Sequence, residues 1–323
     1  MRHADVRDRH PRRHQRGVAV LTAIFIVALA AIAATALLSS TGIALRRTSN
    51  LQDSEAAWWY ASGLEDWVAG LLRRRPGQPD VDFLGQQWAQ PVDNLPYGRG
   101  SVSGRLVDLQ GRFNLNNLAT TGTGLKAYEQ QFKLLLASIP GLNLSDTAEL
   151  PERIHSWLTP RPIGGPASPD DVLYLSLDPP YRPAGQLFQS VSGLQAIAGV
   201  TPTMYEALRP YVAALPQTGT PINVNTAPLP VLLSLALDVN ASRLSEFVKT
   251  RIKQPATSVQ QLYGTQLNLL PADVPQSRVA VATSYFQLRA HILVGSARLD
   301  LYSDIRRQGS GIPVVYVRTT GAD

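Results

Sequence analysis

The sequence predicts an α/β protein in which a long N-terminal helix packs on an antiparallel sheet, with a large all-α domain inserted into that frame. An uncharged apolar run over residues 18–38 is followed by an apolar stripe with helical spacing. Strand-like patterns occur near residues 101–109 and again over 285–318, whereas the chain between them reads as short helices separated by proline and glycine turns. We therefore expect two distant segments to build one sheet.

The apolar run is long enough to cross a membrane. At about 1.5 Å per helical residue, Val18–Leu38 spans roughly 31 Å, the thickness of the hydrocarbon core. Residues 1–17 carry six arginines against two aspartates, a net charge of +4 within the chain's total of +6. The positive-inside rule therefore keeps this segment in the cytoplasm and places the rest of the chain outside.

The border of the apolar run has a glycine, Gly17, directly before Val18 and no small-residue cleavage box. This junction resembles the leader of type IV prepilins and type II secretion pseudopilins. The resemblance implies that a prepilin peptidase cuts between Gly17 and Val18 and that Val18 is then N-methylated. Two alternatives stay open: a signal peptide cut after Ala36, at Ala34-Thr35-Ala36, or a plain signal anchor in which Gly17 has no special role.

An amphipathic helix is predicted to continue the membrane helix to about Arg75, where Pro76-Gly77 ends it. A single helix over residues 18–75 would be roughly 87 Å long. The alternative is a break at residues 39–42, Ser-Ser-Thr-Gly. The stripe that predicts the helix consists of Ala57, Tyr60, Ala61, Leu64, Trp67, Val68, Leu71 and Leu72.

Short elements follow along the chain. Strands are expected at Ser101–Leu109, Tyr285–Val294, Ala297–Arg306 and Val314–Arg318. The predicted helices are Leu125–Ser138, Leu150–Leu158, Val191–Ile197, Pro202–Val212, Leu229–Leu237 and Ala241–Lys253.

Composition argues against catalysis. The chain has no cysteine, which excludes disulfides, thiol chemistry and Cys-ligated zinc. Only His155 and His291 lie outside the leader, and both are expected to be structural. Carboxylate pairs such as Glu149 with Glu152 have no accompanying nucleophile and are expected to be solvated. We therefore predict that the protein is not an enzyme.

Nearly the whole chain resembles the K-class minor pseudopilins of type II secretion systems, the GspK family. The resemblance implies a pilin-like α/β fold, with a leader at 1–17, a transmembrane helix at 18–38 and the periplasmic half of the spine helix at 39–76. It further implies a pilin-like domain from 77–113 and 280–323, with an inserted α-helical domain at 114–279. The phrases that carry the resemblance are Gly17-Val-Ala-Val-Leu-Thr, Asp108-Leu-Gln-Gly-Arg-Phe-Asn-Leu-Asn, Trp157-Leu, Pro180-Tyr-Arg-Pro-Ala, Ser190-Val-Ser-Gly-Leu and Ile222-Asn-Val-Asn-Thr-Ala.

The resemblance also implies a function. A K-class subunit would join the I- and J-class minor pseudopilins, and then other pseudopilins, in the bacterial inner membrane, with its folded part in the periplasm. It would cap the tip of the pseudopilus and help to initiate its assembly. Thr22 stands where most pilin-like subunits carry a glutamate, and this too resembles the K class. The alternative is that threonine is simply tolerated there, with its hydroxyl bonded to the preceding turn.

The resemblance implies a possible calcium site in the loop after Trp157. Here Thr159 and Arg161 stand where two carboxylates are expected, and only Asp170 and Asp171 remain. Calcium prefers six to eight oxygen ligands, several of them carboxylates. The same two aspartates can equally be explained as the acidic first turn of a helix.

The strongest rival function is a membrane-anchored, exported DNA-binding module with helix-hairpin-helix repeats. Residues 222–227, Ile-Asn-Val-Asn-Thr-Ala, are similar to the start of such modules, but the expected hairpin at 235–240 contains no glycine. Among the nearby basic residues Arg243, Lys249, Arg251 and Lys253 there is a single aromatic residue, Phe247, and no interleaved series of them. We therefore expect no nucleic acid partner, and we expect Asn225 or Thr226 to cap a helix ahead of Pro228.

Overall fold

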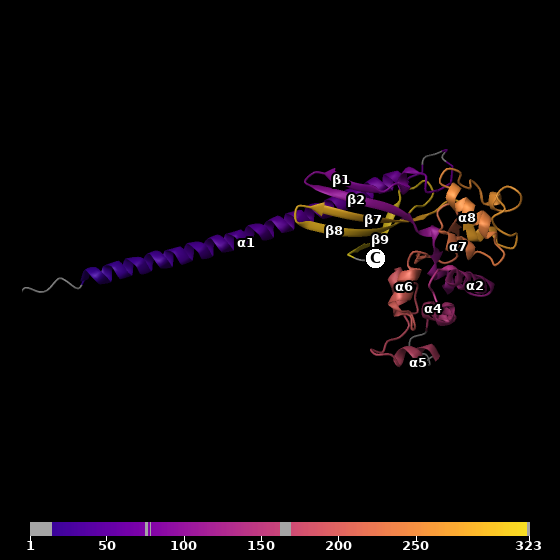
Figure 1. Cartoon of the computed structure of the whole chain (residues 1–323), viewed down its shortest axis with the longest axis horizontal. Coiled ribbons are helices and arrows are strands. Elements are labelled where there is room, and N and C mark those ends of the chain that lie inside the picture. The colour runs from indigo at the N-terminus through magenta and orange to yellow at the C-terminus, as the bar shows by residue number, and fades with distance from the viewer. Residues whose placement is uncertain (1–14, 75–76, 78, 162–168, 322–323) are drawn as a thin grey trace, which may run out of the picture.

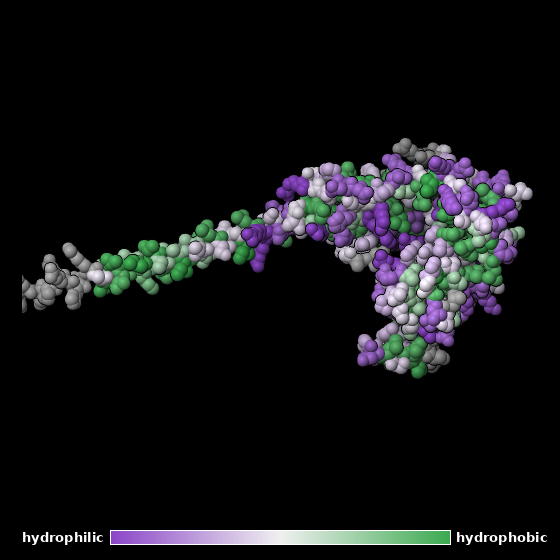
Figure 2. All heavy atoms as spheres, viewed as in Figure 1, coloured by the Kyte–Doolittle hydropathy of each residue, from purple (hydrophilic) through white to green (hydrophobic). Residues whose placement is uncertain are grey.

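A single long helix dominates the computed structural model, which describes residues 15–74, 77, 79–161 and 169–321. Helix α1 (Gln15–Leu72) projects far beyond the folded part of the chain, as Figure 1 shows. Its N-terminal half is fully exposed in the monomer and has a mean hydropathy of 2.7 over its most apolar window. By length and composition this helix can cross a membrane, and Figure 2 shows its apolar surface giving way to polar side chains near the sheet.

The helix is continuous through the polar stretch at residues 39–42. The hydroxyls of Ser40 and Thr41 each donate to the Leu37 carbonyl at 2.9 Å. Bonding back to the preceding turn satisfies these side chains without interrupting the helix. The predicted single spine is therefore confirmed over Gln15–Leu72, and the alternative of a break is wrong.

Five antiparallel strands form the main sheet, in the order β1-β2-β7-β8-β9. All four predicted strands are present, and β1 is an edge strand that the sequence reading missed. Gly295 forms the tight β7–β8 turn with a φ of +54°, and a side chain there would collide with the Asp53 carboxylate of α1. The strands are β1 (Val92–Tyr97), β2 (Gly100–Asp108), β7 (Tyr285–Val294), β8 (Ala297–Arg306) and β9 (Val314–Thr320).

Helix α1 packs its C-terminal half on β7 and β8. Ala57, Ala61 and Val68 are buried there, as the apolar stripe predicts. Trp67 was assigned to the same stripe, but it is 52% exposed, because the indole lies on the flank of the buried face. Two acidic side chains, Asp53 and Glu65, are buried instead.

The regular elements between β2 and β7 are mostly short helices joined by loops, and this part of the chain lies beside the sheet (Figure 1). It is not strictly all-α, because two short parallel pairs occur in it: β3 (Phe113–Asn114) with β4 (Val212–Ala213), and β5 (Ile222–Asn223) with β6 (Val279–Ala280). Val212 belongs to β4, so the helix predicted to reach it ends at Leu208. The helices are α2 (Thr123–Ser138), α3 (Leu144–Thr147), α4 (Leu150–Leu158), α5 (Pro169–Leu175), α6 (Pro202–Leu208), α7 (Leu229–Leu233) and α8 (Ala241–Thr250).

Two separate hydrophobic cores result from this layout. One lies between α1 and the sheet, and the other fills the helical region. A small third cluster, built from Leu109, Ala213, Leu215 and Tyr285, lies between them. The sheet and the helical region therefore meet through limited apolar contact, and polar contacts must supply much of the connection between them.

Candidate functional site

The predicted processing junction lies at the start of α1. Gly17 is within the helix, and Val18 is 62% exposed. The Thr22 hydroxyl lies 3.1 Å from the Val18 carbonyl oxygen and 2.9 Å from that of Ala19, so it donates within its own helix. This position therefore adds no charge and no unpaired donor to an apolar segment.

The outer face of α1 carries large aromatic side chains that the described residues of the chain leave about half exposed or more. Trp59 is 77% exposed and lies opposite the buried face, with Trp58 and Trp67 on the two flanks. Gly63 and Gly70 lie on the same side, and a Cβ built on either glycine would meet nothing within 4 Å. We call these five residues the outer spine face. Because glycine has no side chain, the helix surface is lower at Gly63, which lies between Trp59 and Trp67, and at Gly70, one turn beyond Trp67. We call these two positions the notch.

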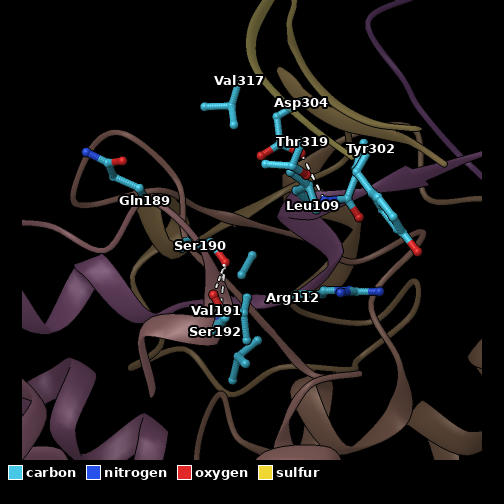
Figure 3. Close-up of a pocket in the computed structure, with 14 residues that line it drawn as sticks. Leu109, Arg112, Gln189, Ser190, Val191, Ser192, Tyr302, Asp304, Val317 and Thr319 are labelled. Carbon is cyan, nitrogen blue, oxygen red and sulfur yellow. Dashed lines mark hydrogen bonds between the residues drawn. The ribbon is translucent and has the colours of Figure 1, made fainter. Parts of the chain in front are cut away.

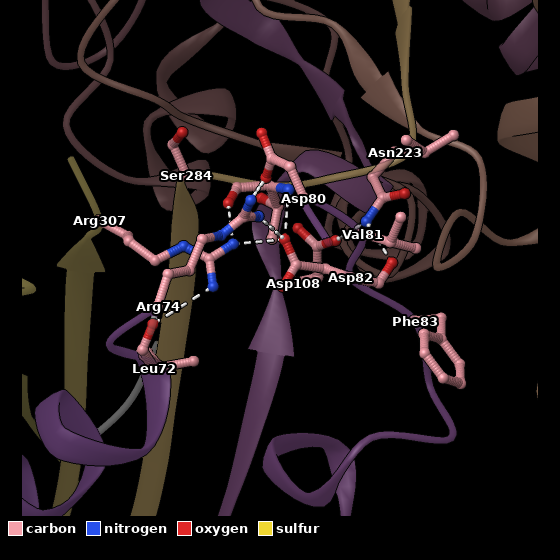
Figure 4. Close-up of polar contacts among 12 residues, drawn as sticks. Leu72, Arg74, Asp80, Val81, Asp82, Phe83, Asp108, Asn223, Ser284 and Arg307 are labelled. Carbon is pink, nitrogen blue, oxygen red and sulfur yellow. Dashed lines mark hydrogen bonds and ion pairs between the residues drawn. The ribbon is translucent and has the colours of Figure 1, made fainter. Parts of the chain in front are cut away.

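A buried ionic cluster, which we call the joint, ties the end of α1 to the sheet and the helical region. The Asp82 carboxylate accepts from Arg74 at 2.8 Å, from the Thr283 amide at 2.8 Å and from Arg307 (Figure 4). Arg307 also donates to the Leu72 carbonyl at 3.3 Å. Asp82 and Arg307 are both nearly inaccessible to solvent, so each needs the other's charge.

A second carboxylate, Asp108, extends the joint into the helical region. It accepts from the Asn223 side chain at 2.8 Å, from the Thr226 hydroxyl at 2.7 Å and from the Gln110 amide at 2.8 Å. Complete burial raises the pKa of Asp108, while these hydrogen bonds partly offset that effect. Sequence reasoning missed the joint, because the bonds that join Asp82 to Thr283 and Arg307, and Asp108 to Asn223 and Thr226, connect residues more than 100 positions apart with no common motif.

The Asn-Thr-Ala phrase serves packing in this protein. The Asn225 side chain donates to the Ala256 carbonyl at 2.9 Å and accepts from the Ala256 amide at 2.9 Å, and Thr226 bonds Asp108. The residue that precedes α7 is Pro228, with no side-chain cap. The predicted N-cap at Asn225 or Thr226 is therefore wrong, because both side chains already have distant partners.

The basic residues near α8 do not form one surface. Arg251 is buried, and its guanidinium donates to the carbonyls of Val224 at 2.7 Å and Ala227 at 2.6 Å. Burial lowers the pKa of Arg251 to about 10. Arg243, Lys249 and Lys253 are exposed, so three of the four basic residues lie on the surface and the fourth is committed to the interior.

The loop proposed for calcium contains an internal ion pair. Arg161 contacts the Asp171 carboxylate and also donates to the Ser156 hydroxyl at 2.8 Å. Asp170 and Asp171 are the second and third residues of α5, as the helix-start alternative expects; the Asp170 side chain lies outside the described part of the structure.

The fit to calcium is poor in the part of the loop that the structure describes. The Thr159 hydroxyl donates back to His155 at 2.8 Å, so it is directed at α4. Over residues 15–74, 79–161 and 169–321, no group of three or more His, Cys, Asp and Glu side chains is placed to hold a metal ion.

A small polar cavity lies between the sheet and the helical region (Figure 3). It encloses about 200 Å³, which is less than small-molecule sites usually offer. Arg112, Ser190 and Asp304 are among its lining residues. The described residues that line it include no histidine.

The fold defines a class: a long helix packed on an antiparallel sheet is the architecture of a pilin-like subunit, and by length and composition the exposed part of this helix can cross a membrane. Comparison with known proteins identifies the family. Residues 111–217 match the family model for type II secretion system (T2SS) protein K. Type II secretion system protein K of Pseudomonas aeruginosa is 32% identical over 96% of this chain and 94% of that protein. Protein K of Aeromonas hydrophila is 30% identical over 90% and 92%.

The chain therefore belongs to the type II secretion system protein K family. A solved structure, the GspK-GspI-GspJ complex of the enterotoxigenic Escherichia coli type 2 secretion system, contains a chain with a similar fold. The TM-score is 0.71 at 26% identity, over 86% of this chain and 100% of that chain.

Proposed function

We propose that this protein is a non-enzymatic minor pseudopilin that joins I- and J-class partners, caps the tip of the pseudopilus and helps to start its assembly. The observation that carries the proposal is the shared fold with a chain of the GspK-GspI-GspJ complex. The helical region supports the tip position, because it widens the subunit beside the sheet and would obstruct another subunit stacked above it (Figure 1).

The orientation follows from the charges that flank the apolar helix. The leader carries a net charge of +4 and would remain in the cytoplasm, so the sheet and the helical region would lie in the periplasm. The neutral Thr22 suits a terminal subunit, because a buried carboxylate in hydrocarbon needs a positive partner from a neighbouring chain.

The outer spine face is the surface we assign to the I- and J-class partners. Exposed tryptophans are typical anchors of protein interfaces. The notch at Gly63 and Gly70 would allow a second helix to approach closely, as small residues do between packed helices. Two exposed carboxylates, Glu55 and Asp66, accompany the tryptophans, so a partner helix with basic residues beside its apolar stripe would fit best.

Co-purification tests the assembly. The full chain would be co-expressed with the I- and J-class pseudopilins of the same bacterium, solubilised from membranes in detergent and isolated through a C-terminal tag. We expect a stable complex that contains all three chains. Recovery of this chain alone, together with salt-dependent binding to DNA, would instead support the exported DNA-binding alternative.

Mass spectrometry of the mature N-terminus tests the route into the filament. We expect the chain to begin with methylated Val18, which follows from cleavage after Gly17. A chain that begins at Leu37 would indicate signal peptidase cleavage after Ala36 and would rule out the pilin pathway.

A further inference from the structure

Arg161 connects two helices of the helical region. It lies just beyond α4, and Asp171 lies in the first turn of α5. One end of the guanidinium contacts the Asp171 carboxylate, and the other donates to the Ser156 hydroxyl at 2.8 Å and to the Ser156 carbonyl at 3.3 Å. The cation therefore links the last turn of α4 to the first turn of α5.

The surroundings make this charge necessary. The Asp171 side chain is only 11% exposed and that of Arg161 is 24% exposed. A carboxylate withdrawn from water to this extent is costly unless a positive charge compensates it. Nearby, Trp157 lies edge-on to Tyr174 with ring centroids 5.3 Å apart, so α4 and α5 are also held by apolar contact.

We propose that the Arg161 guanidinium is the resident cation between the last turn of α4 and the first turn of α5, so that these two helices pack together without calcium. Calcium would have to displace the guanidinium from Asp171, and the fixed positive charge of Arg161 would oppose a divalent ion at the same place. The inference does not depend on the proposed function, because it concerns only which cation neutralises the Asp171 carboxylate.

Hydrogen–deuterium exchange of the full chain in detergent provides a local test. Peptides that cover α4 and α5 would be followed with excess EGTA and then with millimolar calcium. We expect the wild-type protein to show the same protection in both conditions and the same Tm. Added protection in these peptides, or a calcium-dependent rise of Tm in the wild type, would overturn the proposal.

A variant tests the role of the arginine. Arg161→Met keeps much of the aliphatic length but removes the charge, and we expect faster exchange in the α5 peptide and a Tm lower by about 2–4 °C. Lys133→Ala is the matched control, because it removes an exposed ion pair with Glu152 in the same region. It should leave the α5 peptide unchanged. Arg161→Met with wild-type exchange and Tm would contradict the proposal, and the wild-type calcium comparison decides it even if the variant fails to fold.

Discussion

Asp108 is the residue at which pH should act most directly on the fold. Its pKa is raised by burial, and the negative charge of nearby Asp82 adds to the effect. The native state therefore holds the proton more tightly than the unfolded chain does. The stabilisation is complete below the unfolded pKa of 3.8 and is lost as the pH rises through the folded value.

The variant Asp108→Asn removes this titration. We expect it to be less stable than the wild type in acid. Oδ1 accepts from the Gln110 N–H, while Oδ2 accepts from Asn223 and Thr226, so an NH2 group at either place faces a donor and cannot accept. The difference in the free energy of unfolding between the wild type and the variant should narrow as the pH rises from 4 toward 7, because only the wild type has, at position 108, a carboxyl group that loses its proton in this range. Urea unfolding at several pH values measures it, and a difference that is constant with pH would contradict the assignment.

Glu65 is a buried carboxylate of helix α1 that connects the helix to the sheet. It accepts from the Arg318 Nε at 2.9 Å, and it also bonds the Ser303 hydroxyl, which ties α1 to β8 and β9. We expect Glu65→Ala to cost about 1–3 kcal/mol in the free energy of unfolding, because Ser303 and Arg318 lose their acceptor. Glu55→Ala, exposed on the same helix, should cost much less, and equal losses in urea melts would refute this role.

Residue patterns could predict which apolar positions are buried but not these polar ones. Ala57, Ala61 and Val68 follow the helical period and are buried as expected. Glu65 lies 253 positions from Arg318, so nothing local in the sequence marks it as an interior residue. The ion pair between Arg161 and Asp171 was missed for a different reason. Arg161 stands where a calcium-binding carboxylate is expected, and its own positive charge was not considered as a partner for Asp171.

At the scale of elements, prediction worked where the periodicity was long. The spine and the strands β2, β7, β8 and β9 were anticipated, since each buries one regular face. The pairs β3–β4 and β5–β6 were not, because two-residue strands have no periodicity. Edge strand β1 was missed because it is almost wholly exposed and contains Pro96.

The outer spine face gives a prediction for helix α1. Gly63→Leu fills the notch without touching this chain, since a Cβ there meets nothing within 4 Å. We expect a Tm that is equal or higher, because leucine favours the helix more than glycine does, but about tenfold weaker binding to the I- and J-class partners under the proposed function. The control is Gln130→Leu, which adds a similar apolar group to an exposed position of α2. Undiminished binding by Gly63→Leu would exclude this face as the contact.

At the scale of the whole molecule, the joint connects the core between α1 and the sheet to the core of the helical region. The apolar cluster between the cores is small, whereas Asp82, Asp108 and Arg307 connect the end of α1, the sheet and the helical region. If the helical region caps a filament, this connection would transmit load between it and the membrane-anchored spine. Coupling between the cores should therefore depend on charge.

Arg307→Met tests that coupling. It leaves Asp82 buried with one fewer cation, and loss of a partner from a buried ion pair costs about 3–5 kcal/mol. We expect hydrogen exchange in α2 and α8 to separate from exchange in β7 and β8, so that the two cores open at different urea concentrations instead of together. Arg298→Met changes an exposed arginine of β8 and should keep a single transition. If both variants retain one cooperative transition at the wild-type midpoint, apolar packing alone joins the cores and the joint has no mechanical role.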